Sequence, residues 1–419
     1  MYVDLKYEPE KNDLICEFRI EPAKGISIKE AAENIAAESS IGTWTEVKTM
    51  NPEIRKLGAK VFSIKGNFIK IAYPLELFEP GNMSQILSSI AGNVFGVKAI
   101  KNLRLEDVEW PYELVKSFKG PLYGIEGIRK LLNIWDRPLC GTIIKPKLGL
   151  NEEQHAKVAY EAWTGGVDIV KDDENLSSLS FNKFEKRIIE TLKMRDKAEK
   201  ETGERKMYMP NVTAETDAML ERASFVKEAG GEYAMVDIIT VGWSALQTLR
   251  NANENLKLVL HGHRAGHAAF TRGKHGISML VIADIARLIG LDQLHIGTII
   301  GKMEGVKEEI LSIEEEIEKK IIKEKGHHLA EDWHNIKPMF AVCSGGLHPG
   351  SIPYLVETLG KDIIIQAGGG IHGHPSGTKA GAKAMRQAIE AAKQGITLKT
   401  YSNNHKELAD AIKKFGVSK

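Results

Sequence analysis

Residues 139–174 read LCGTIIKPKLGLNEEQHAKVAYEAWTGGVDIVKDDE and contain two short apolar runs separated by a helical pattern. The runs LCGTIIKP (139–146) and VDIVKDDE (167–174) have the length of buried strands, and EEQHAKVAYEAWTGG between them has helical periodicity. A strand, a helix and a second strand in this order form one unit of a parallel sheet.

The same alternation continues along the rest of the chain. Further apolar runs lie at 207–213, 233–241, 257–264, 293–298, 339–346 and 362–370. Eight strands alternating with helices over about 280 residues predict a (β/α)8 TIM barrel, whose usual size is about 250 residues. An open doubly wound sheet is the alternative, but it usually carries an early glycine fingerprint that this sequence lacks. The charged stretch 314–328 is interpreted as a solvated helix followed by its exit turn.

The chain before these runs has a different pattern. LICEFRI, KVFSIKG, FIKIAYP and RLEDVEWP resemble strands, and SIKEAAENIAAESS has the periodicity of a helix. They predict a small α+β domain of ferredoxin-like type around an antiparallel sheet. A linker with Pro111, Gly120 and Pro121 follows, so we expect this domain at 1–118 and the catalytic barrel domain at 119–419.

Composition excludes several classes of protein. The 419 residues carry 57 Lys and Arg against 56 Asp and Glu, whereas a nucleic-acid binder usually has a basic excess. No window approaches the roughly 18 uninterrupted apolar residues of a membrane span, and the charged start predicts no secretory leader. Three cysteines cannot form a disulfide framework, so we expect a reducing cytoplasm. Twelve of the 13 histidines lie between His261 and His405.

The strand ends carry the chemistry of a barrel of this kind. The second run ends in Lys171, Asp172, Asp173 and Glu174, and carboxylates this dense repel one another unless a cation lies between them. Hard oxygen ligands suit Mg2+, for which Asp173 and Glu174 are the better candidates. Asp172 points to the other face of the strand and is interpreted as a structural partner. Lys171 is either a simple counter-charge or an amine that reacts with CO2 to form an anionic carbamate ligand.

Basic and imidazole groups follow other runs. Lys145 and Lys147 flank Pro146 and are candidate proton donors or phosphate counter-charges. His263 and Arg264 share one turn, where Arg suits bidentate phosphate recognition and His titrates near neutrality. Zinc is the alternative for the HGH pair, but no third ligand matches.

Glycine-rich segments follow the seventh and eighth runs, where barrels often bind phosphate. They contain Ser344, Gly345 and Gly346, and then Gly368–Gly370, although tight turns alone also use glycine. The sixth run carries His295 and is followed by Lys302, which has glycines nearby on both sides. This spacing predicts a mobile loop that brings an ammonium group over the site.

These motifs resemble the large chain of ribulose-1,5-bisphosphate carboxylase/oxygenase (RuBisCO). The resemblance rests on GTIIKPKLGL, GGVDIVKDDEN, HGHRAGHA, HIGTIIGKMEG, CSGG and QAGGG, with AAESSIGTWTEV and GNVFGVKA nearer the start. It covers nearly the whole chain in order. SSIGTW and MPNVTAET are similar to the archaeal-type form III enzymes.

The resemblance implies a role for each matching residue. Lys171 would be carbamylated by an activating, non-substrate CO2 and would hold Mg2+ together with Asp173 and Glu174. Lys145 would protonate the final three-carbon carbanion with support from Lys147. His263 would act as acid and base near the C3 hydroxyl. Lys302 would steady the incoming carboxylate. Implied contacts around one phosphate are Arg264, His295 and Ser344, and those around the other are Thr43, Trp44, Gly346, Gly368 and Gly369. Gly345 is a further substrate-binding residue, and Glu38 and Asn93 would come from a partner subunit.

The implied reaction carboxylates ribulose 1,5-bisphosphate to two 3-phosphoglycerates through a Mg-bound enediolate, with O2 as the competing substrate of an oxygenase side reaction. The minimal active unit would be a homodimer, or an assembly of dimers, without a small subunit. The pathway would be nucleoside monophosphate (AMP) salvage. A RuBisCO-like enolase or isomerase is the main alternative, but such relatives typically lose residues matching Glu38, Lys145, His295 or Lys302. A non-catalytic scaffold would not need a complete acid–base set.

Overall fold

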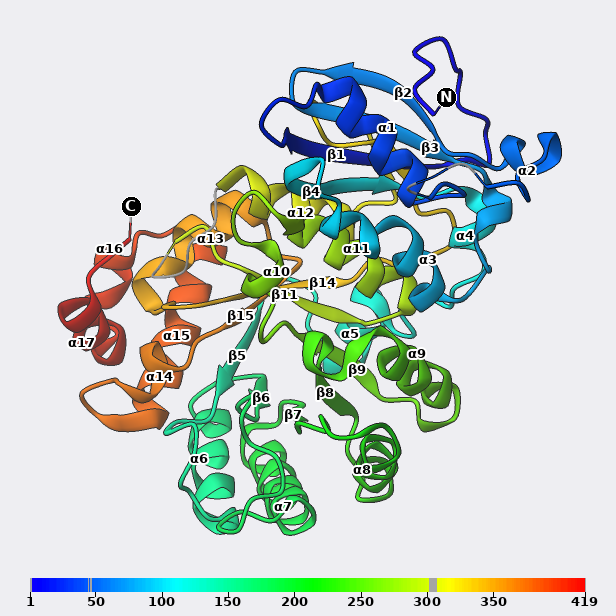
Figure 1. Ribbon diagram of the computed structural model, residues 1–419. Coiled ribbons are helices and arrows are strands. Elements are labelled where there is room, and N and C mark those ends of the chain that lie inside the picture. The colour runs from blue at the N-terminus through cyan, green and yellow to red at the C-terminus, as the bar shows by residue number, and fades with distance from the viewer. Residues whose placement is uncertain (1, 44, 46, 301–306, 419) are drawn as a thin grey trace. The chain divides into compact units, whose positions relative to one another are not determined.

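The computed structural model describes residues 2–43, 45, 47–300 and 307–418, which form two compact units (Figure 1). The first unit contains Met1–Gly120, Gly266–Ile289 and Lys319–Ile336. The second contains Pro121–Ala265, Gly290–Glu318 and Lys337–Lys419. The chain therefore leaves the second unit twice and returns to it.

The first unit is built on a five-stranded sheet in the order β10-β4-β1-β3-β2. The pairs β1–β3, β1–β4 and β2–β3 are antiparallel, which confirms the predicted α+β domain. Residues 15–20 of β1 are mostly buried, so both faces of this strand are covered. The bounds are β1 Leu14–Pro22, α1 Ile28–Glu38, α2 Pro52–Lys56, β2 Lys60–Lys65, β3 Phe68–Tyr73, α3 Met83–Ile90, β4 Ile100–Glu109, α4 Tyr112–Val115, α10 Ala268–Thr271, β10 Gly276–Ile277 and α11 Met279–Ile289.

The stretch predicted to be a charged helix is helical in its first residues only. Helix α12 (Lys307–Glu318) ends at Glu318, and β12 (Ile321–Ile322) then pairs antiparallel with β13 (Glu331–Asp332). The predicted exit turn is thus a short hairpin. It forms because Ile322 and Trp333 are buried in the first unit, and this burial outweighs the helical preference of the charged neighbours.

The second unit is the predicted barrel. Its eight strands are neighbours in the order β7-β6-β5-β15-β14-β11-β9-β8, and every pair is parallel. The ring closes beyond the end of β7, where the backbone N–H of Val212 donates to Met235 O at 3.0 Å and that of Met235 donates to Pro210 O at 2.8 Å. The strand bounds are β5 Leu139–Ile143, β6 Ile169–Lys171, β7 Met207–Met209, β8 Tyr233–Asp237, β9 Val259–His263, β11 Gln293–Gly297, β14 Phe340–Ser344 and β15 Ile363–Gln366.

Helices between the strands surround this barrel (Figure 1). They are α6 Glu152–Thr164, α7 Phe184–Thr202, α8 Thr216–Glu228, α9 Ile238–Leu256, α13 Ile352–Leu359, α14 Gly369–His372, α15 Gly377–Lys393, α16 Leu398–Ser402 and α17 Lys406–Phe415. Among the described helices, none is long and apolar enough to cross a membrane.

Helix α5 (Gly124–Leu132) closes the N-terminal end of the barrel. Its Ile128 and Leu132 belong to one buried cluster with the first residues of most strands, among them Leu139, Tyr233 and Phe340. This end is filled with apolar side chains. The polar side chains that end the strands therefore gather at the opposite, C-terminal end.

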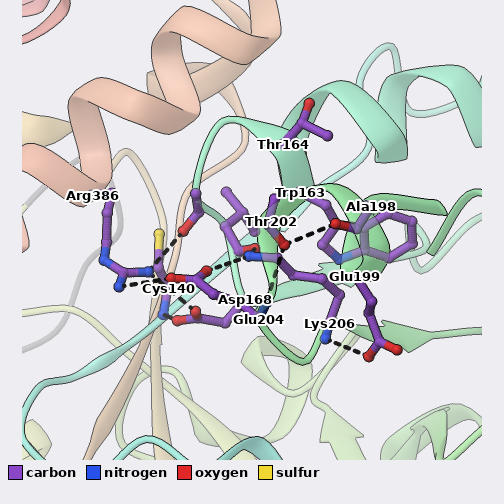
Figure 2. A network of polar contacts seen from close by, with 12 residues as sticks. Cys140, Trp163, Thr164, Asp168, Ala198, Glu199, Thr202, Glu204, Lys206 and Arg386 are labelled. Carbon is purple, nitrogen blue, oxygen red and sulfur yellow. Dashed lines mark hydrogen bonds and ion pairs between the residues drawn. The ribbon is translucent and has the colours of Figure 1, made fainter. Parts of the chain in front are cut away.

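A buried ion pair fixes the N-terminal ends of β5 and β6 to the helical layer. Asp168 accepts two hydrogen bonds of 2.7 Å from the Arg137 guanidinium and one of 2.8 Å from Cys140 N. Arg386 of α15 lies 3.5 Å from the same carboxylate (Figure 2). Burial alone would raise the pKa of Asp168, but these cations hold it below its usual value.

We expect Arg137→Met to lower the free energy of unfolding by about 3 kcal/mol, because the fully buried Asp168 loses its two 2.7 Å hydrogen bonds and keeps only the weaker attraction of Arg386 and Lys206. Since the folded-state pKa of Asp168 is depressed, the stabilisation is present above the unfolded value of about 3.9 and is lost as the pH falls through the folded value. Urea titrations at several pH values measure this. A difference between variant and wild type that grows on acidification would contradict the assignment.

Candidate active site

The acidic side chains that follow β6 lie in two different environments. Asp172 points away from the barrel interior, where its carboxylate accepts from Tyr208 Oη at 2.7 Å, Asn211 N at 3.0 Å and Arg187 Nε at 3.1 Å. Burial opposes its charge, but Arg187 and the hydrogen bonds hold the pKa of Asp172 well below its usual range. The prediction that Asp172 is a structural partner is confirmed.

Lys171 is fully buried at the end of β6. Its Nζ donates to the backbone oxygen of Asp172 at 2.8 Å. Burial lowers the pKa of this ammonium, while the charges of Glu174, Asp237 and Asp173 act in the opposite direction. Lys171 is therefore a fully buried side chain in the negative field of several carboxylates. The same field would attract a metal cation.

Lys145 and Asp173 form a close pair at the ends of β5 and β6. Lys145 Nζ donates to Asp173 Oδ2 at 2.6 Å, and Asn175 also donates to Asp173. Burial raises the pKa of Asp173, but Lys145 and Asn175 lower it by more than burial raises it, so the carboxylate is ionised. Lys147 is exposed, and it forms no hydrogen bond or ion pair with any described residue.

A histidine and two carboxylates meet across the barrel mouth. His263 Nδ1, at the end of β9, donates to Asp237 Oδ1 at 2.6 Å. Its other nitrogen, Nε2, lies 3.8 Å from Glu174 Oε2. An aspartate bound to one ring nitrogen fixes the tautomer and leaves Nε2 as a proton acceptor. His263 and Asp237 thus have the arrangement of an oriented general base.

Asp237 is a residue that sequence reasoning missed. We expected a strand over 233–241, but β8 ends at Asp237 and α9 begins at Ile238. The apolar letters IITV continue the run in the sequence, and periodicity cannot distinguish a strand from the first turn of a buried helix. With the correct boundary, the strand-end rule would have pointed to Asp237.

His295 lies inside the barrel, and both of its ring nitrogens are engaged. Nδ1 is 2.7 Å from Ser344 Oγ, and Nε2 is 2.9 Å from His261 Nε2. Burial lowers the pKa of His261 and of His295 well below the usual histidine value, so both rings are neutral. His261 is thus in direct contact with a candidate site residue.

Arg264 follows His263 at the barrel mouth. Among the described residues its guanidinium has no hydrogen bond or ion pair, and burial lowers its pKa to about 10. A Cβ atom on Gly297, which has φ +95°, would lie 2.6 Å from Arg264 Nη2. Glycine here makes room for a guanidinium whose donors remain available to an anion.

The glycine-rich loops after β14 and β15 pack closely together. Gly345 and Gly346 have φ of +110° and +76°, which favours glycine. A Cβ on Gly370 would lie 2.1 Å from the carbonyl oxygen of Leu347. Gly368 approaches Lys145, whose Cε would be 3.0 Å from an added Cβ. The loops therefore bring backbone groups next to Lys145, which follows β5.

The other predicted site residues belong to the first unit or lie outside the described residues. Glu38 at the end of α1, Thr43, and Asn93 are exposed in the first unit. Trp44 and Lys302 lie outside the described residues, and so does the predicted loop movement around Lys302. Their assignments remain predictions.

The donor set at the end of β6 offers two carboxylates in sequence, Asp173 and Glu174. Among the described residues no three His, Cys, Asp or Glu side chains are grouped closely enough to hold a metal ion. Mg2+ is usually held by one or two carboxylates, with water or substrate oxygens in its other positions, and Asp173 and Glu174 fit that requirement. A carbamate on Lys171 would add a third anionic oxygen at the same place.

Family models match both parts of the chain. The model "Ribulose bisphosphate carboxylase large chain, catalytic domain" covers residues 124–415, and the corresponding N-terminal domain model covers 1–114. A ribulose bisphosphate carboxylase of Methanosarcina mazei is 53% identical over 421 residues, which cover 99% of this chain and 98% of that protein. One of Methanocaldococcus jannaschii is 53% identical over 424 residues, or 98% and 99%.

Solved structures agree with these sequence matches. A dimeric archaeal Rubisco from Hyperthermus butylicus has a TM-score of 0.94 and 47% identity, covering 100% of this chain and 99% of that one. An octameric Rubisco from Pyrococcus horikoshii, in complex with sulfate ion, has a TM-score of 0.92 and 48% identity, covering 100% and 97%.

Proposed function

The chain belongs to the ribulose bisphosphate carboxylase large-chain family, and we propose that its carboxylase reaction is Mg2+-dependent and occurs at the barrel mouth described above. The observation that carries the proposal is the convergence of Lys145, Lys171, Asp173, Glu174 and His263 at the C-terminal strand ends of one barrel, where Lys145 contacts Asp173 and His263 lies near Glu174. These groups supply an acid, a base and an anionic cation site at one barrel mouth.

Lys171, as a carbamate, would hold Mg2+ together with Asp173 and Glu174. The bound ion would act as a Lewis acid that lowers the cost of negative charge on the substrate oxygens. The full burial of Lys171 supports this role, because a buried cationic side chain is costly unless it is paired or chemically converted.

His263 is proposed to move the proton at C3. Its Nδ1 is bound to Asp237 at 2.6 Å, which would leave Nε2, 3.8 Å from Glu174 Oε2, as the accepting nitrogen. The enediolate formed from ribulose 1,5-bisphosphate then joins CO2 at C2, and hydration and cleavage give two 3-phosphoglycerates. Lys145 would protonate the three-carbon carbanion that cleavage leaves. O2 reacts with the same enediolate, which gives the oxygenase side reaction.

Arg264, Ser344 and the glycine-rich loops would receive the two phosphate ends of the substrate. The guanidinium of Arg264, which has no hydrogen bond or ion pair within the described part of the chain, supports an anion site at one end of the barrel mouth. Gly345, Gly346, Gly368 and Gly369 are proposed for the other end, together with Thr43 and Trp44. We also propose that Lys147 supports Lys145 and that Lys302 steadies the new carboxylate.

A homodimer, or a higher assembly of dimers, is the proposed active form, with Glu38 and Asn93 reaching the site of the partner subunit. Dimeric and octameric assemblies of the two structural relatives support it. The three cysteines are free and buried, which suits a reducing cytoplasm. Similarity to archaeal chains supports a role in AMP salvage, which predicts labelled 3-phosphoglycerate in extracts supplied with AMP and labelled CO2.

The experiment that tests the proposal uses the purified chain with ribulose 1,5-bisphosphate and labelled bicarbonate, with and without Mg2+. We expect acid-stable label in 3-phosphoglycerate that disappears when a chelator removes the metal and returns when Mg2+ is restored. Equal labelling in the chelated sample would exclude the metal-dependent mechanism.

We expect Arg264→Lys to raise the KM for ribulose 1,5-bisphosphate roughly tenfold, with a smaller change in kcat. Lysine keeps the positive charge but cannot form the bidentate hydrogen bond of a guanidinium to a phosphate. Steady-state kinetics measures it. Arg386→Lys, at the N-terminal end of the barrel, is the matched control and should leave KM unchanged. An unchanged KM in Arg264→Lys would remove Arg264 from the phosphate site.

A further inference from the structure

The loop after β7 carries no side chain that the sequence pattern assigned to the site, yet it contacts the backbone of the proposed metal ligands. Asn211, the second residue after β7, is fully buried. Its Nδ2 donates to the carbonyl oxygen of Glu174 at 3.0 Å and, at 3.4 Å, to that of Asp173. Its Oδ1 accepts from the backbone N–H of Thr213 at 3.0 Å. Because a backbone carbonyl only accepts and a backbone N–H only donates, these contacts fix the orientation of the amide.

Glu174 depends on this amide more than its neighbour does. It lies beyond the end of β6, where no strand partner holds its backbone. Within the described ranges, its carbonyl oxygen has one hydrogen-bond donor, the Asn211 amide. Asp173 has further anchors, since its carbonyl accepts from Leu176 N at 3.0 Å and its carboxylate accepts from Lys145 Nζ at 2.6 Å. Loss of the amide would therefore release Glu174 first.

A second set of contacts joins the same loop to the proposed base. Thr213 Oγ1 accepts from the backbone N–H of Asp237 at 2.9 Å, and Asp237 Oδ1 binds His263 Nδ1 at 2.6 Å. His263 Nε2 in turn lies 3.8 Å from Glu174 Oε2. The contacts thus form a closed ring, in which Asn211 and Thr213 connect the metal ligand to the base.

The backbone around Asn211 is itself held in place. Its own N–H donates to Asp172 Oδ2 at 3.0 Å. On the other side, Val212 N donates to Met235 O at 3.0 Å, and Met235 N donates to Pro210 O at 2.8 Å. These bonds fix the loop to β6 and β8, so the amide is already oriented toward its partners and can hold a more weakly anchored segment.

We propose that Asn211 is a positioning residue that holds Glu174 in place as a metal ligand and keeps its carboxylate apart from His263. Without the amide, the Glu174 carboxylate could approach the imidazole instead of the ion. Thr213 is a second positioning residue, which acts on Asp237 and through it on His263. Both act through other residues and neither is a catalytic residue. The inference deepens the proposed function and rests on it for the identity of the metal site.

Binding of Mn2+, a paramagnetic substitute for Mg2+, tests the role of Asn211 directly. Mn2+ is titrated into the full chain in bicarbonate buffer without sugar substrate, and electron paramagnetic resonance measures the free ion. Asn211→Ala removes the contacts of the amide. We expect the Kd for Mn2+ to rise about tenfold, as is usual when a partner that orients a metal ligand is lost. A Kd equal to that of the wild type would overturn the proposal.

Asn253 provides the matched control. It is also fully buried, and its amide bridges backbone groups in the same way, with Nδ2 donating to Leu258 O at 2.7 Å and Oδ1 accepting from Leu258 N at 2.9 Å. It lies in the last turn of α9, at the N-terminal end of the barrel. Asn253→Ala should lower thermal stability and keep the wild-type Kd for Mn2+. An equal rise in the two variants would indicate general destabilisation and contradict a positioning role.

Thr213→Val tests the other half of the ring. Valine keeps the shape of threonine but cannot accept from the Asp237 N–H. In protein activated with bicarbonate and Mg2+, we expect solvent exchange of the C3 hydrogen of ribulose 1,5-bisphosphate to slow about three- to tenfold, the effect of one lost hydrogen bond. The Kd for Mn2+ should stay at the wild-type value. Unchanged exchange, or a rise in Kd as large as that of Asn211→Ala, would overturn the separate role of Thr213.

The Mn2+ measurement also separates this inference from the proposed function. A wild type that binds Mn2+ but does not carboxylate ribulose 1,5-bisphosphate would refute the proposed function, and the comparison of Asn211→Ala with Asn253→Ala would still decide the role of Asn211. An active wild type whose Mn2+ affinity is the same in both variants would leave the proposed function standing and refute the inference.

Discussion

Lys171→Ala should abolish carboxylation, with kcat/KM reduced by on the order of 10³-fold or more. Alanine cannot form a carbamate, so Asp173 and Glu174 would remain as the only anionic ligands, and the described residues offer no third carboxylate or imidazole near enough to replace it. Labelled-bicarbonate incorporation measures the loss. Because Lys171 is one of the largest fully buried side chains, thermal unfolding of the variant should accompany the assay.

Lys206 provides the control for the removal of a buried lysine. It is also fully buried, but it lies at the start of β7, where Nζ donates to Val167 O at 3.0 Å and to Glu204 Oε2 at 2.7 Å (Figure 2). Lys206→Met should lower stability and keep the turnover of its folded fraction. Wild-type turnover in Lys171→Ala, or an equal loss of turnover in the two variants, would contradict the ligand role of Lys171.

His263→Asn should lower kcat/KM by about 10²–10⁴-fold, the usual contribution of a general base. Asparagine can still hydrogen-bond to Asp237 but has no nitrogen that accepts a proton. Asp237→Asn should give a smaller loss, because His263 keeps its ring but loses the carboxylate that fixes its tautomer at 2.6 Å. Steady-state kinetics with ribulose 1,5-bisphosphate measures both.

Hydrogen exchange at C3 separates this role from a structural one. If His263 moves the C3 proton, the variant should also lose the exchange of that hydrogen with solvent in the absence of CO2. His405→Asn, the same substitution at the start of α17, is the control and should leave both rates unchanged. Full exchange in His263→Asn would assign the base to another residue.

Much of the catalytic unit could be predicted because its pattern is local. Each barrel strand is a short apolar run that ends in polar letters, and parallel strands in a closed barrel bring those ends together. This rule assigns Lys145, Lys171, Asp173 and His263 to one barrel mouth from the amino-acid sequence alone. The small antiparallel domain was predictable for the same reason.

The parts that could not be predicted depend on long-range packing. His261 Nδ1 lies 2.8 Å from Gln293 Oε1 because the register between β9 and β11 sets these two residues side by side. The sequence of either strand alone does not determine that register. Strand β10 joins β4 of the first unit although about 170 residues separate Gly276 from Arg104 in sequence. The hairpin at Ile321–Ile322 depends on burial within the same unit.

Carbon-13 NMR of the wild-type chain, supplied with labelled bicarbonate, Mg2+ and ribulose 1,5-bisphosphate, is the sharpest test of the carbamate-dependent carboxylation. We predict a label in the carboxyl carbon of 3-phosphoglycerate and a second, protein-bound carbamate resonance that is present in Lys206→Met and missing in Lys171→Ala. Wild-type protein that leaves 3-phosphoglycerate unlabelled, or a carbamate resonance that persists in Lys171→Ala, would contradict this mechanism.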